Sequence, residues 1–181
     1  AMKHAVGPRR EMGIRTIFNI LGPMTNPARA NVQLTGVFAK ELTVPLAEVL
    51  SRLGMKRTLV VWGEGNMDEM TVTGTSYVAE AHDGMVESYT VDPEDVGLSR
   101  ADIDDIRGGA TAEESASLLR EVLGNKSGAR LDIVLLNAGA ALLAAGKVDY
   151  LRAGVEQARE IIASGAALKK LDQLVAFCKE V

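Results

Sequence analysis

Two adjacent carboxylates, Asp68 and Glu69, have the residue types and spacing to hold a metal ion. They follow a glycine-rich turn, which itself follows the apolar run at residues 59–62. Magnesium takes oxygen ligands, keeps several waters, and is typically held by one or two carboxylates together with substrate phosphates. The pair therefore fits two interpretations: a magnesium site that carries phosphate, or a solvated acidic turn.

A second candidate for chemistry is the pair Arg9 and Arg10. A guanidinium makes paired hydrogen bonds to a carboxylate or a phosphate. Neighbours on a helix point about 100° apart, so one arginine can face a cleft while the other meets Glu11 or solvent. His4 is close enough in sequence to line the same cleft. The alternative is a surface pair engaged in local ion pairs.

The other polar and reactive side chains reduce the number of site types that the sequence can form. The single cysteine, Cys178, excludes an internal disulfide and predicts a packed thiol, and the sequence has no zinc-ligand spacing. His82 precedes a turn and is expected to be exposed. Trp62 could wall a cleft or simply pack. Asn26 and Asn137 could order loops or helix contacts.

Length and composition bound the class of protein. A chain of 181 residues with 47% apolar residues predicts one globular domain. A net charge of -4 with scattered basic residues argues against a nucleic-acid surface. The most apolar stretch, residues 133–145, is too short to span a bilayer, and no signal-peptide layout is seen, so we expect a soluble, cytoplasmic protein. Charged, patterned sequence begins at once without an initiator Met, which leaves two interpretations: Ala1-Met2 is a cloning remnant, or the sequence starts inside a longer polypeptide.

The elements that must position the acids form a strand, helix and strand. Residues 32–38 are apolar and partly β-branched, as in a strand buried on both faces. A helix is predicted from Thr43, which can cap it, to Gly54, and residues 58–62 form a second buried strand. This order predicts a parallel pair, and ligands gather after the carboxyl ends of such strands. Asp68 and Glu69 lie in such a loop.

The rest of the chain adds a hairpin and helices. Asp83-Gly84 between alternating segments is a strong hairpin signal, and Thr111 with Glu114 has the spacing of a capping box. A polar loop is expected at residues 22–30. We therefore predict an α/β fold, with part of a mainly parallel sheet flanked by helices and an antiparallel hairpin. The predicted helices cover about 2–20, a segment from 112, 131–145, 149–164 and 167–179.

Several long segments of the chain resemble one enzyme family. They are AMKHAVGPRREMGIRTIFNILGPMTNPA, VQLTGVF, GEGNMDEMTVTG, and the later AEAHDG, GG and LNAG. In this order they resemble the C-terminal part of the anthranilate phosphoribosyltransferases of tryptophan biosynthesis. The resemblance implies a fold like the C-terminal region of nucleoside phosphorylases and phosphoribosyltransferases. It also implies that residues 1–181 are the C-terminal portion of the family's α/β domain.

The resemblance implies a reaction and a role for each candidate residue. The family transfers the ribosyl phosphate of phosphoribosyl pyrophosphate to the amino group of anthranilate and releases pyrophosphate. Arg9 would contact the anthranilate carboxylate, while Asp68 and Glu69 would hold magnesium bound to the pyrophosphate. No catalytic residue is assigned as a general base, because positioning does most of the work. The family usually forms a homodimer through a helical N-terminal domain.

The chain also departs from the family pattern. Trp62 stands where many relatives have a histidine. The family's glycine-rich GTGGD loop and helical domain match no part of these residues, so we expect this chain alone to be inactive. Two alternatives stay open: an enzyme like the pyrimidine nucleoside phosphorylases, which share the architecture, and a non-catalytic assembly domain.

Overall fold

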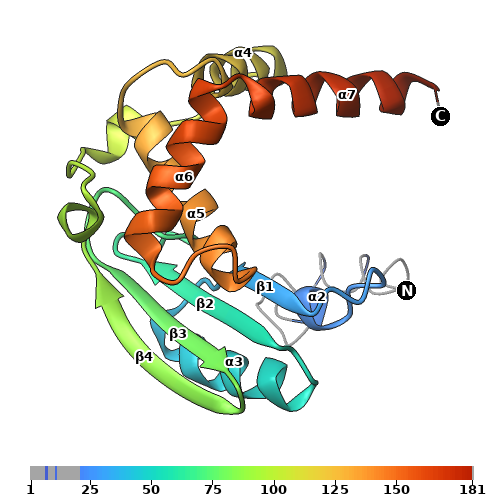
Figure 1. Ribbon diagram of the computed structural model, residues 1–181, viewed down its shortest axis with the longest axis vertical. Helices are drawn as coiled ribbons and strands as arrows, with labels where there is room; N and C mark the ends of the chain where they lie inside the picture. The colour runs from blue at the N-terminus through green and yellow to red at the C-terminus, as the bar shows by residue number, and fades with distance from the viewer. Residues whose placement is uncertain (1–6, 8–10, 12–20, 181) are drawn as a thin grey trace. The chain divides into compact units, whose positions relative to one another are not determined.

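The computed structural model describes residues 7, 11 and 21–180 (Figure 1). The chain divides into two compact units, residues 1–30 and 31–181. In the first unit, α2 (Leu21–Met24) runs through Gly22-Pro23, where a polar loop is predicted. Proline is tolerated there because the first turn of a helix leaves its N–H groups unpaired. Apart from residues 7 and 11, the helix predicted over 2–20 lies outside the described residues.

The second unit is built on a four-stranded sheet in the order β1-β2-β3-β4. The first two strands are parallel, and each later pair is antiparallel, so the described part of the sheet is mixed. The predicted strand, helix and strand are confirmed, with α3 joining the parallel pair. The bounds are β1 (Val32–Gly36), α3 (Thr43–Arg52), β2 (Arg57–Gly63), β3 (Ser76–His82) and β4 (Met85–Val91).

The two parallel strands differ in burial. Most of β2 is buried, as predicted. Only Thr35 of β1 is buried, which corrects the expectation of a strand covered on both faces. The reason is that β1 ends the described sheet and has one strand neighbour there.

Two of the turns with positive φ occur where the sequence predicts them. Asp83 and Gly84 have φ values of 52° and 78° between β3 and β4. Positive φ at both central residues matches the tight type I′ hairpin, whose twist follows that of the strands. Gly54, with φ 88°, ends the helical segment after α3. These short-range signals therefore place two connections around the sheet.

Helix α3 buries part of its apolar side and lacks the predicted cap. Leu46 and Leu50 are buried, but Val49 and Leu53 are 38% and 61% exposed. The Oγ1 of Thr43 donates to the Lys40 carbonyl (2.8 Å) and does not cap the helix. A short 3-10 turn, Lys40–Leu42, precedes α3, so Thr43 is already inside the helical segment.

The remaining helices cover the sheet and extend beyond it. Helix α3 packs against β2 and β3, α5 packs against β1 and β2, and α6 packs on α5 (Figure 1). The capping box predicted for α4 is half formed: Thr111 Oγ1 accepts from the Glu114 N–H (3.1 Å), while the Glu114 carboxylate accepts the N–H of Ala110 (2.7 Å) in place of that of Thr111. The bounds are α4 (Ala112–Leu123), α5 (Ala129–Ala144), α6 (Leu151–Ala163) and α7 (Ala166–Glu180).

One hydrophobic cluster joins the sheet to α5 and α6. It includes Leu59 and Val61 of β2, Leu135 of α5, and Val155 of α6, each at most 2% exposed. The cluster therefore fixes α5 relative to the parallel strands.

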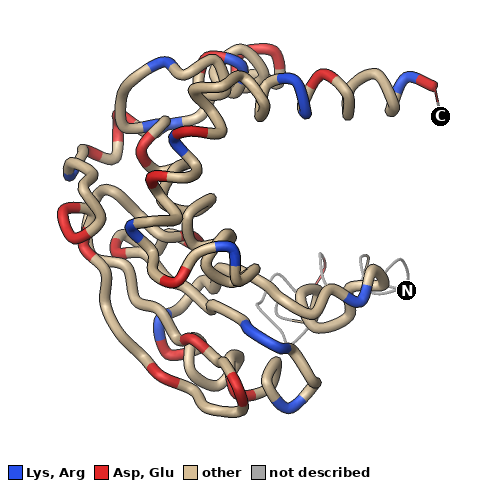
Figure 2. The backbone as a smooth tube through the Cα atoms, viewed as in Figure 1, with Lys and Arg blue, Asp and Glu red and all other residues tan. Residues whose placement is uncertain are grey.

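Charged side chains of both signs are spread over the described backbone (Figure 2). Among the described residues, no helix has both the length and the apolar character needed to cross a membrane.

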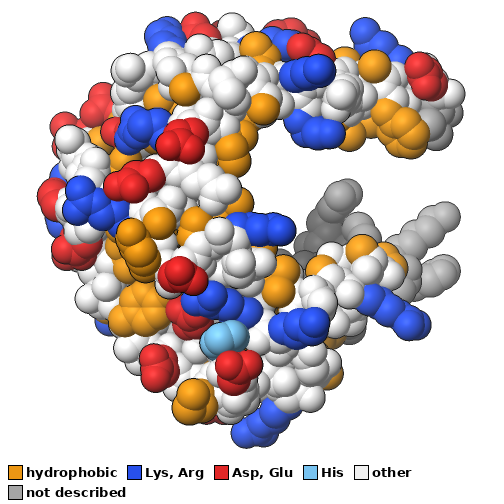
Figure 3. Space-filling model, in the orientation of Figure 1, with side chains coloured by type: hydrophobic (Ala, Val, Ile, Leu, Met, Phe, Trp, Pro, Cys, Tyr) orange, Lys and Arg blue, Asp and Glu red, His pale blue; other side chains and the backbone are white. Residues whose placement is uncertain are grey.

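Helix α7 exposes much of its apolar side. Leu174 and Phe177 are 57% and 63% exposed, and hydrophobic atoms lie on the surface of this helix (Figure 3). Cys178 is also exposed, so the prediction of a packed thiol is wrong for the described structure. The predicted helix is present, but none of the described helices or strands covers the C-terminal end of α7.

Candidate functional site

The carboxylate pair lies at the carboxyl ends of the two parallel strands. After β2 the chain forms a tight loop in which Gly63 and Met67 exchange backbone hydrogen bonds of 2.9 and 3.0 Å. Gly65 and Asn66 turn the chain with φ values of 84° and 63°. The loop therefore brings Asp68 back to the sheet instead of carrying it away.

Two glycines allow the segment of Asp68 and Glu69 to lie directly on the strand ends. A Cβ added to Gly36, the last residue of β1, would overlap the carbonyl group of Asp68. A Cβ added to Gly63, the last residue of β2, would lie 2.6 Å from the carbonyl oxygen of Glu69. Only glycine leaves room for both approaches.

Helix α5 holds the same segment from the other side through the amide of Asn137. Its Oδ1 accepts from the Met70 N–H (3.0 Å), and its Nδ2 donates to the Met70 carbonyl (2.8 Å). The Nδ2 also donates to the Ile133 carbonyl (3.0 Å) and to Oε2 of Glu69 (3.4 Å). The expectation that Asn137 orders a loop is confirmed.

The chain after the acids is anchored by hydrogen bonds within the loop. The Thr71 N–H donates to Oγ of Ser76 (2.9 Å), at the start of β3. Glu64 donates its N–H to the Thr75 carbonyl (2.9 Å) and accepts the Thr75 N–H on Oε2 (3.1 Å). Glu64 therefore supports the loop, while Asp68 and Glu69 remain the acids at the strand ends.

The two acids lie in different environments, and this difference changes the pKa of one of them. Asp68 is exposed, whereas Glu69 is half-buried. Burial, and then the neighbouring charge of Asp68, raise the pKa of Glu69. Both effects oppose the ionised carboxylate, and a cation beside the pair would offset the repulsion between the two charges.

The two carboxylates of Asp68 and Glu69 fit magnesium better than they fit a metal whose ligands all come from the protein. In the part of the chain that the structure describes, no group of three or more His, Cys, Asp or Glu side chains is arranged to hold a metal ion. Two carboxylates are what magnesium takes when waters and phosphate oxygens fill its other positions. Asp68 and Glu69 are thus suited to a metal that arrives with a phosphorylated ligand.

The predicted arginine and histidine candidates have different outcomes. Arg9 and His4 lie outside the described residues. His82 is exposed, as predicted, with Nε2 3.6 Å from Oδ2 of Asp83. Asn26 orders its own loop by accepting the Ala28 N–H on Oδ1 (3.0 Å). The described part of the candidate site therefore consists of the acids and their supports.

Trp62 packs, which is the simpler of its two interpretations. Its ring lies 5.6 Å from that of Tyr77, its cross-strand partner on β3. Lys40 Nζ sits 3.3 Å from the centre of the Tyr77 ring, a cation–π contact. The indole Nε1 is buried without a hydrogen-bond partner in the described structure. The three side chains form a packed stack on the sheet.

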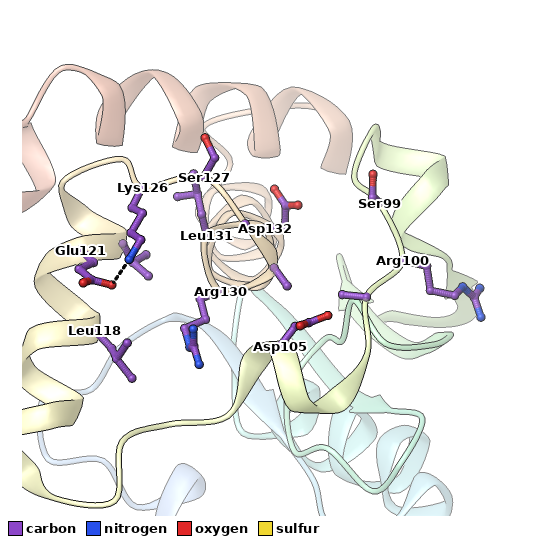
Figure 4. Close-up of a pocket in the computed structure, with 14 residues that line it drawn as sticks. Ser99, Arg100, Asp105, Leu118, Glu121, Lys126, Ser127, Arg130, Leu131 and Asp132 are labelled. Atoms are coloured by element: carbon purple, nitrogen blue, oxygen red, sulfur yellow. Dashed lines mark hydrogen bonds and ion pairs between the residues drawn. The ribbon is translucent and has the colours of Figure 1, made fainter.

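A pocket of about 510 Å³ lies at the start of α5, away from the carboxylate pair (Figure 4). Its cationic side chains are engaged with acidic side chains or with the backbone. Lys126 pairs with Glu121 at 2.8 Å, and Arg130 donates to the Arg107 carbonyl at 3.0 Å. Burial raises the pKa of Asp132, and Arg159, 3.8 Å away, opposes that shift. The cations of this pocket are therefore already neutralised or bonded.

Three supporting residues of the site carry weak sequence signals. Gly63 follows the strand predicted over 58–62, but Gly36 lies inside the strand predicted over 32–38, and neither glycine reveals which backbone approaches it. Asn137 interrupts the apolar run of α5, which indicates a polar contact without naming its partner. The partner is 67 residues earlier in the chain and is found only in the folded structure.

The same fold is found in a known family. The family profile described as "Glycosyl transferase family, a/b domain" matches residues 1–168. The chain belongs to this family. This glycosyl transferase assignment agrees with the resemblance stated from the sequence, and with the α/β fold and the carboxylates after the second strand.

The relatives of this glycosyl transferase domain that are described below all carry the name of the same enzyme. The chain is 72% identical over 177 residues to "Anthranilate phosphoribosyltransferase" of Desulfotalea psychrophila, covering 98% of this chain and 51% of that protein. The crystal structure of the Thermus thermophilus anthranilate phosphoribosyltransferase is 46% identical, with a TM-score of 0.90, covering 98% and 52% of the two chains. The Saccharomyces cerevisiae enzyme in complex with PRPP and Mg is 26% identical, with a TM-score of 0.85, covering 99% and 52%. This glycosyl transferase chain thus spans about half the length of these relatives.

Proposed function

We propose that this chain is the C-terminal part of the α/β domain of an anthranilate phosphoribosyltransferase. The whole enzyme transfers the 5-phosphoribosyl group of phosphoribosyl pyrophosphate to anthranilate, with release of pyrophosphate, in tryptophan biosynthesis. The observation that carries the proposal is the Asp68–Glu69 pair, held at the ends of two parallel strands by Gly36, Gly63 and Asn137. The relatives' names supply the substrates.

Asp68 and Glu69 would hold magnesium in this enzyme. Magnesium, when bound, supplies positive charge that stabilises the diphosphate as it leaves. The S. cerevisiae relative bound to PRPP and Mg supports this role. The chain's own contribution is to keep two carboxylates in place, one exposed and one half-buried, with neither engaged in a structural ion pair that the structure describes.

The acceptor would be recognised by the segment that begins the chain. We propose Arg9 as the residue that binds the anthranilate carboxylate, because a planar guanidinium matches a carboxylate in paired hydrogen bonds. His4 would line the same cleft. No residue is proposed as a general base, since the aromatic amine attacks without one when it is well positioned. A homodimeric, cytoplasmic whole enzyme completes the proposal.

The proposal is tested in a chimeric enzyme, in which this chain replaces the matching segment of the Desulfotalea psychrophila relative. We expect it to form phosphoribosyl anthranilate from both substrates and magnesium. Asp68→Asn with Glu69→Gln should reduce the magnesium-dependent rate by more than the roughly 100-fold seen when only outer-shell partners of a metal are lost. Steady-state kinetics measure the rate, and circular dichroism checks that the variant is folded.

Other outcomes would support a different function. Phosphorolysis of thymidine by the chimera, without transfer to anthranilate, would indicate a nucleoside phosphorylase. Unchanged rates in the folded double variant would exclude a catalytic role for the carboxylates and favour an assembly domain. As a matched control, Asp104→Asn with Glu94→Gln removes two acids that the structure places outside the 63–76 loop and should leave the rate unchanged.

A further inference from the structure

Asn137 of α5 is placed to do more than tie a helix to a loop. It projects from a largely apolar helix, in which Ile133, Leu135 and Leu136 are buried. Its amide reaches Met70, the residue directly after the carboxylate pair, and Met70 is fully buried. The contact therefore fixes the backbone at a point one residue from Glu69.

The amide is locked in one orientation. Its Oδ1 faces the Met70 N–H at 3.0 Å and its Nδ2 faces the Met70 carbonyl at 2.8 Å, the same two bonds that a neighbouring strand would make. The reverse orientation would place donor against donor and acceptor against acceptor. A further bond from Nδ2 to the Ile133 carbonyl, at 3.0 Å, ties the amide to its own helix. Asn137 is thus a rigid connection, since both ends of the amide are engaged.

The amide also touches a carboxylate itself. The two hydrogens of its Nδ2 serve three acceptors, and the longest of these contacts, 3.4 Å to Oε2 of Glu69, is a shared bond that links the amide to the carboxylate. Outer-shell hydrogen bonds of this kind orient the ligands of protein metal sites. The geometry points to Asn137 as a positioning residue that orients Glu69 for the magnesium and pyrophosphate of the reaction. This inference rests on the proposed function, because it needs the pair to be the metal site.

The variant that separates positioning from packing is Asn137→Asp. It keeps the side-chain size and the oxygen that accepts the Met70 N–H, but it replaces the donor to Glu69 and to the Met70 and Ile133 carbonyls by a charged oxygen, whereas Asn137→Ser removes that donor without adding a charge. In the chimeric enzyme we expect the magnesium concentration for half-maximal activity to rise roughly 10- to 100-fold. The KM for anthranilate should stay within about twofold, because Arg9 lies in a different segment. Leu142→Ala, a packing loss on the same helix, is the matched control and should leave both constants unchanged.

A binding measurement supplies a readout that does not depend on turnover. Electron paramagnetic resonance with Mn²⁺ and pyrophosphate as the probe should show weaker Mn²⁺ binding by the same factor in the Asn137→Asp chimera. Asn137→Ser is measured in parallel, so that an unfolded Asp variant does not end the test. Unchanged Mn²⁺ binding in a folded Asn137 variant, or an equal loss in Leu142→Ala, would overturn the inference. If Asp68→Asn with Glu69→Gln also leaves Mn²⁺ binding unchanged, the proposed metal site fails instead.

Discussion

At the level of single residues, the carboxylate pair depends on neighbours that carry no charge. Gly36 and Gly63 make room for its backbone, and the Asn137 amide holds the residue after it. A metal site needs its ligands held by such supports, because two carboxylates in water on a mobile loop would repel each other. The chemistry of Asp68 and Glu69 is therefore inseparable from the shape of the strand ends.

The first residue-scale prediction concerns Gly36. Gly36→Ala should displace the 68–70 backbone, because the new Cβ would occupy the place of the Asp68 carbonyl. We expect a loss of about 1–3 kcal/mol in the free energy of unfolding, typical of overpacking, and a weaker response of the chimera to magnesium. Urea denaturation and magnesium-dependent kinetics measure the two effects.

Gly108→Ala is the control for that experiment. A Cβ on Gly108 meets no atom within 4 Å, and its backbone is in no left-handed conformation, so the substitution should be neutral in both measurements. Equal behaviour of the two variants would show that the close approach at Gly36 has no consequence for the site.

At the level of elements, α5 packs on α6 through two glycines. A Cβ on Gly139 would lie 2.7 Å from the Val155 nitrogen, and a Cβ on Gly154 would lie 2.5 Å from the Gly139 carbonyl oxygen. The two helix backbones are thus in direct contact at this crossing. Because α5 also carries Asn137, the crossing helps to set the distance from that amide to Met70.

A double-mutant cycle at this crossing tests the contact. Gly139→Ala and Gly154→Ala should each destabilise the protein by about 1–3 kcal/mol, since backbone cannot yield as a flexible side chain does. The double variant should cost less than the sum, because the first methyl already forces the helices apart. Urea denaturation gives the free energies. Strict additivity of the two losses would contradict the direct contact.

The elements that the sequence predicts well are those with local causes. The Asp83-Gly84 turn, the Thr111 cap and the glycine stop of α3 each depend on residues close in the chain. The cap predicted at Thr43 is wrong, because a 3-10 turn that has no strong local signal begins the helix earlier.

The candidate site likewise has a part that local sequence predicts and a part that it does not predict. The residue types and the strand-end position make Asp68 and Glu69 candidates from the sequence alone. The close approach at Gly36 and the contact between Asn137 and Met70 join residues far apart in the chain, so no spacing rule predicts them. The packed thiol predicted at Cys178 fails for a related reason, since a helical pattern does not reveal which elements cover it.

At the level of the whole molecule, α7 is one of the elements that expose large apolar side chains. Leu174 and Phe177 are more than half exposed, along a helix that is otherwise amphipathic. Exposed contiguous apolar side chains promote association in water. The end strand β1 adds backbone groups that can pair with another chain. Both features belong to the described surface of this chain.

We therefore predict that this chain, expressed alone, self-associates. Leu174→Lys with Phe177→Lys should shift it toward a monomer, measured by size-exclusion chromatography with light scattering. Leu53→Lys with Ile103→Lys changes two other exposed apolar residues, at 61% and 49% exposure, and serves as the control. A monomeric parent chain at every concentration would contradict the prediction.

The path of α5 has a consequence for how this sequence can vary. The helix meets the sheet loop at Asn137 and meets α6 at Gly139, two residues later. Each residue of a helix turns it by about 100° and advances it about 1.5 Å. An insertion or deletion between these two positions would rotate one contact away from its partner, and no side-chain change nearby could restore both. Substitutions can accumulate along this helix, but its residue count between the two contacts is fixed.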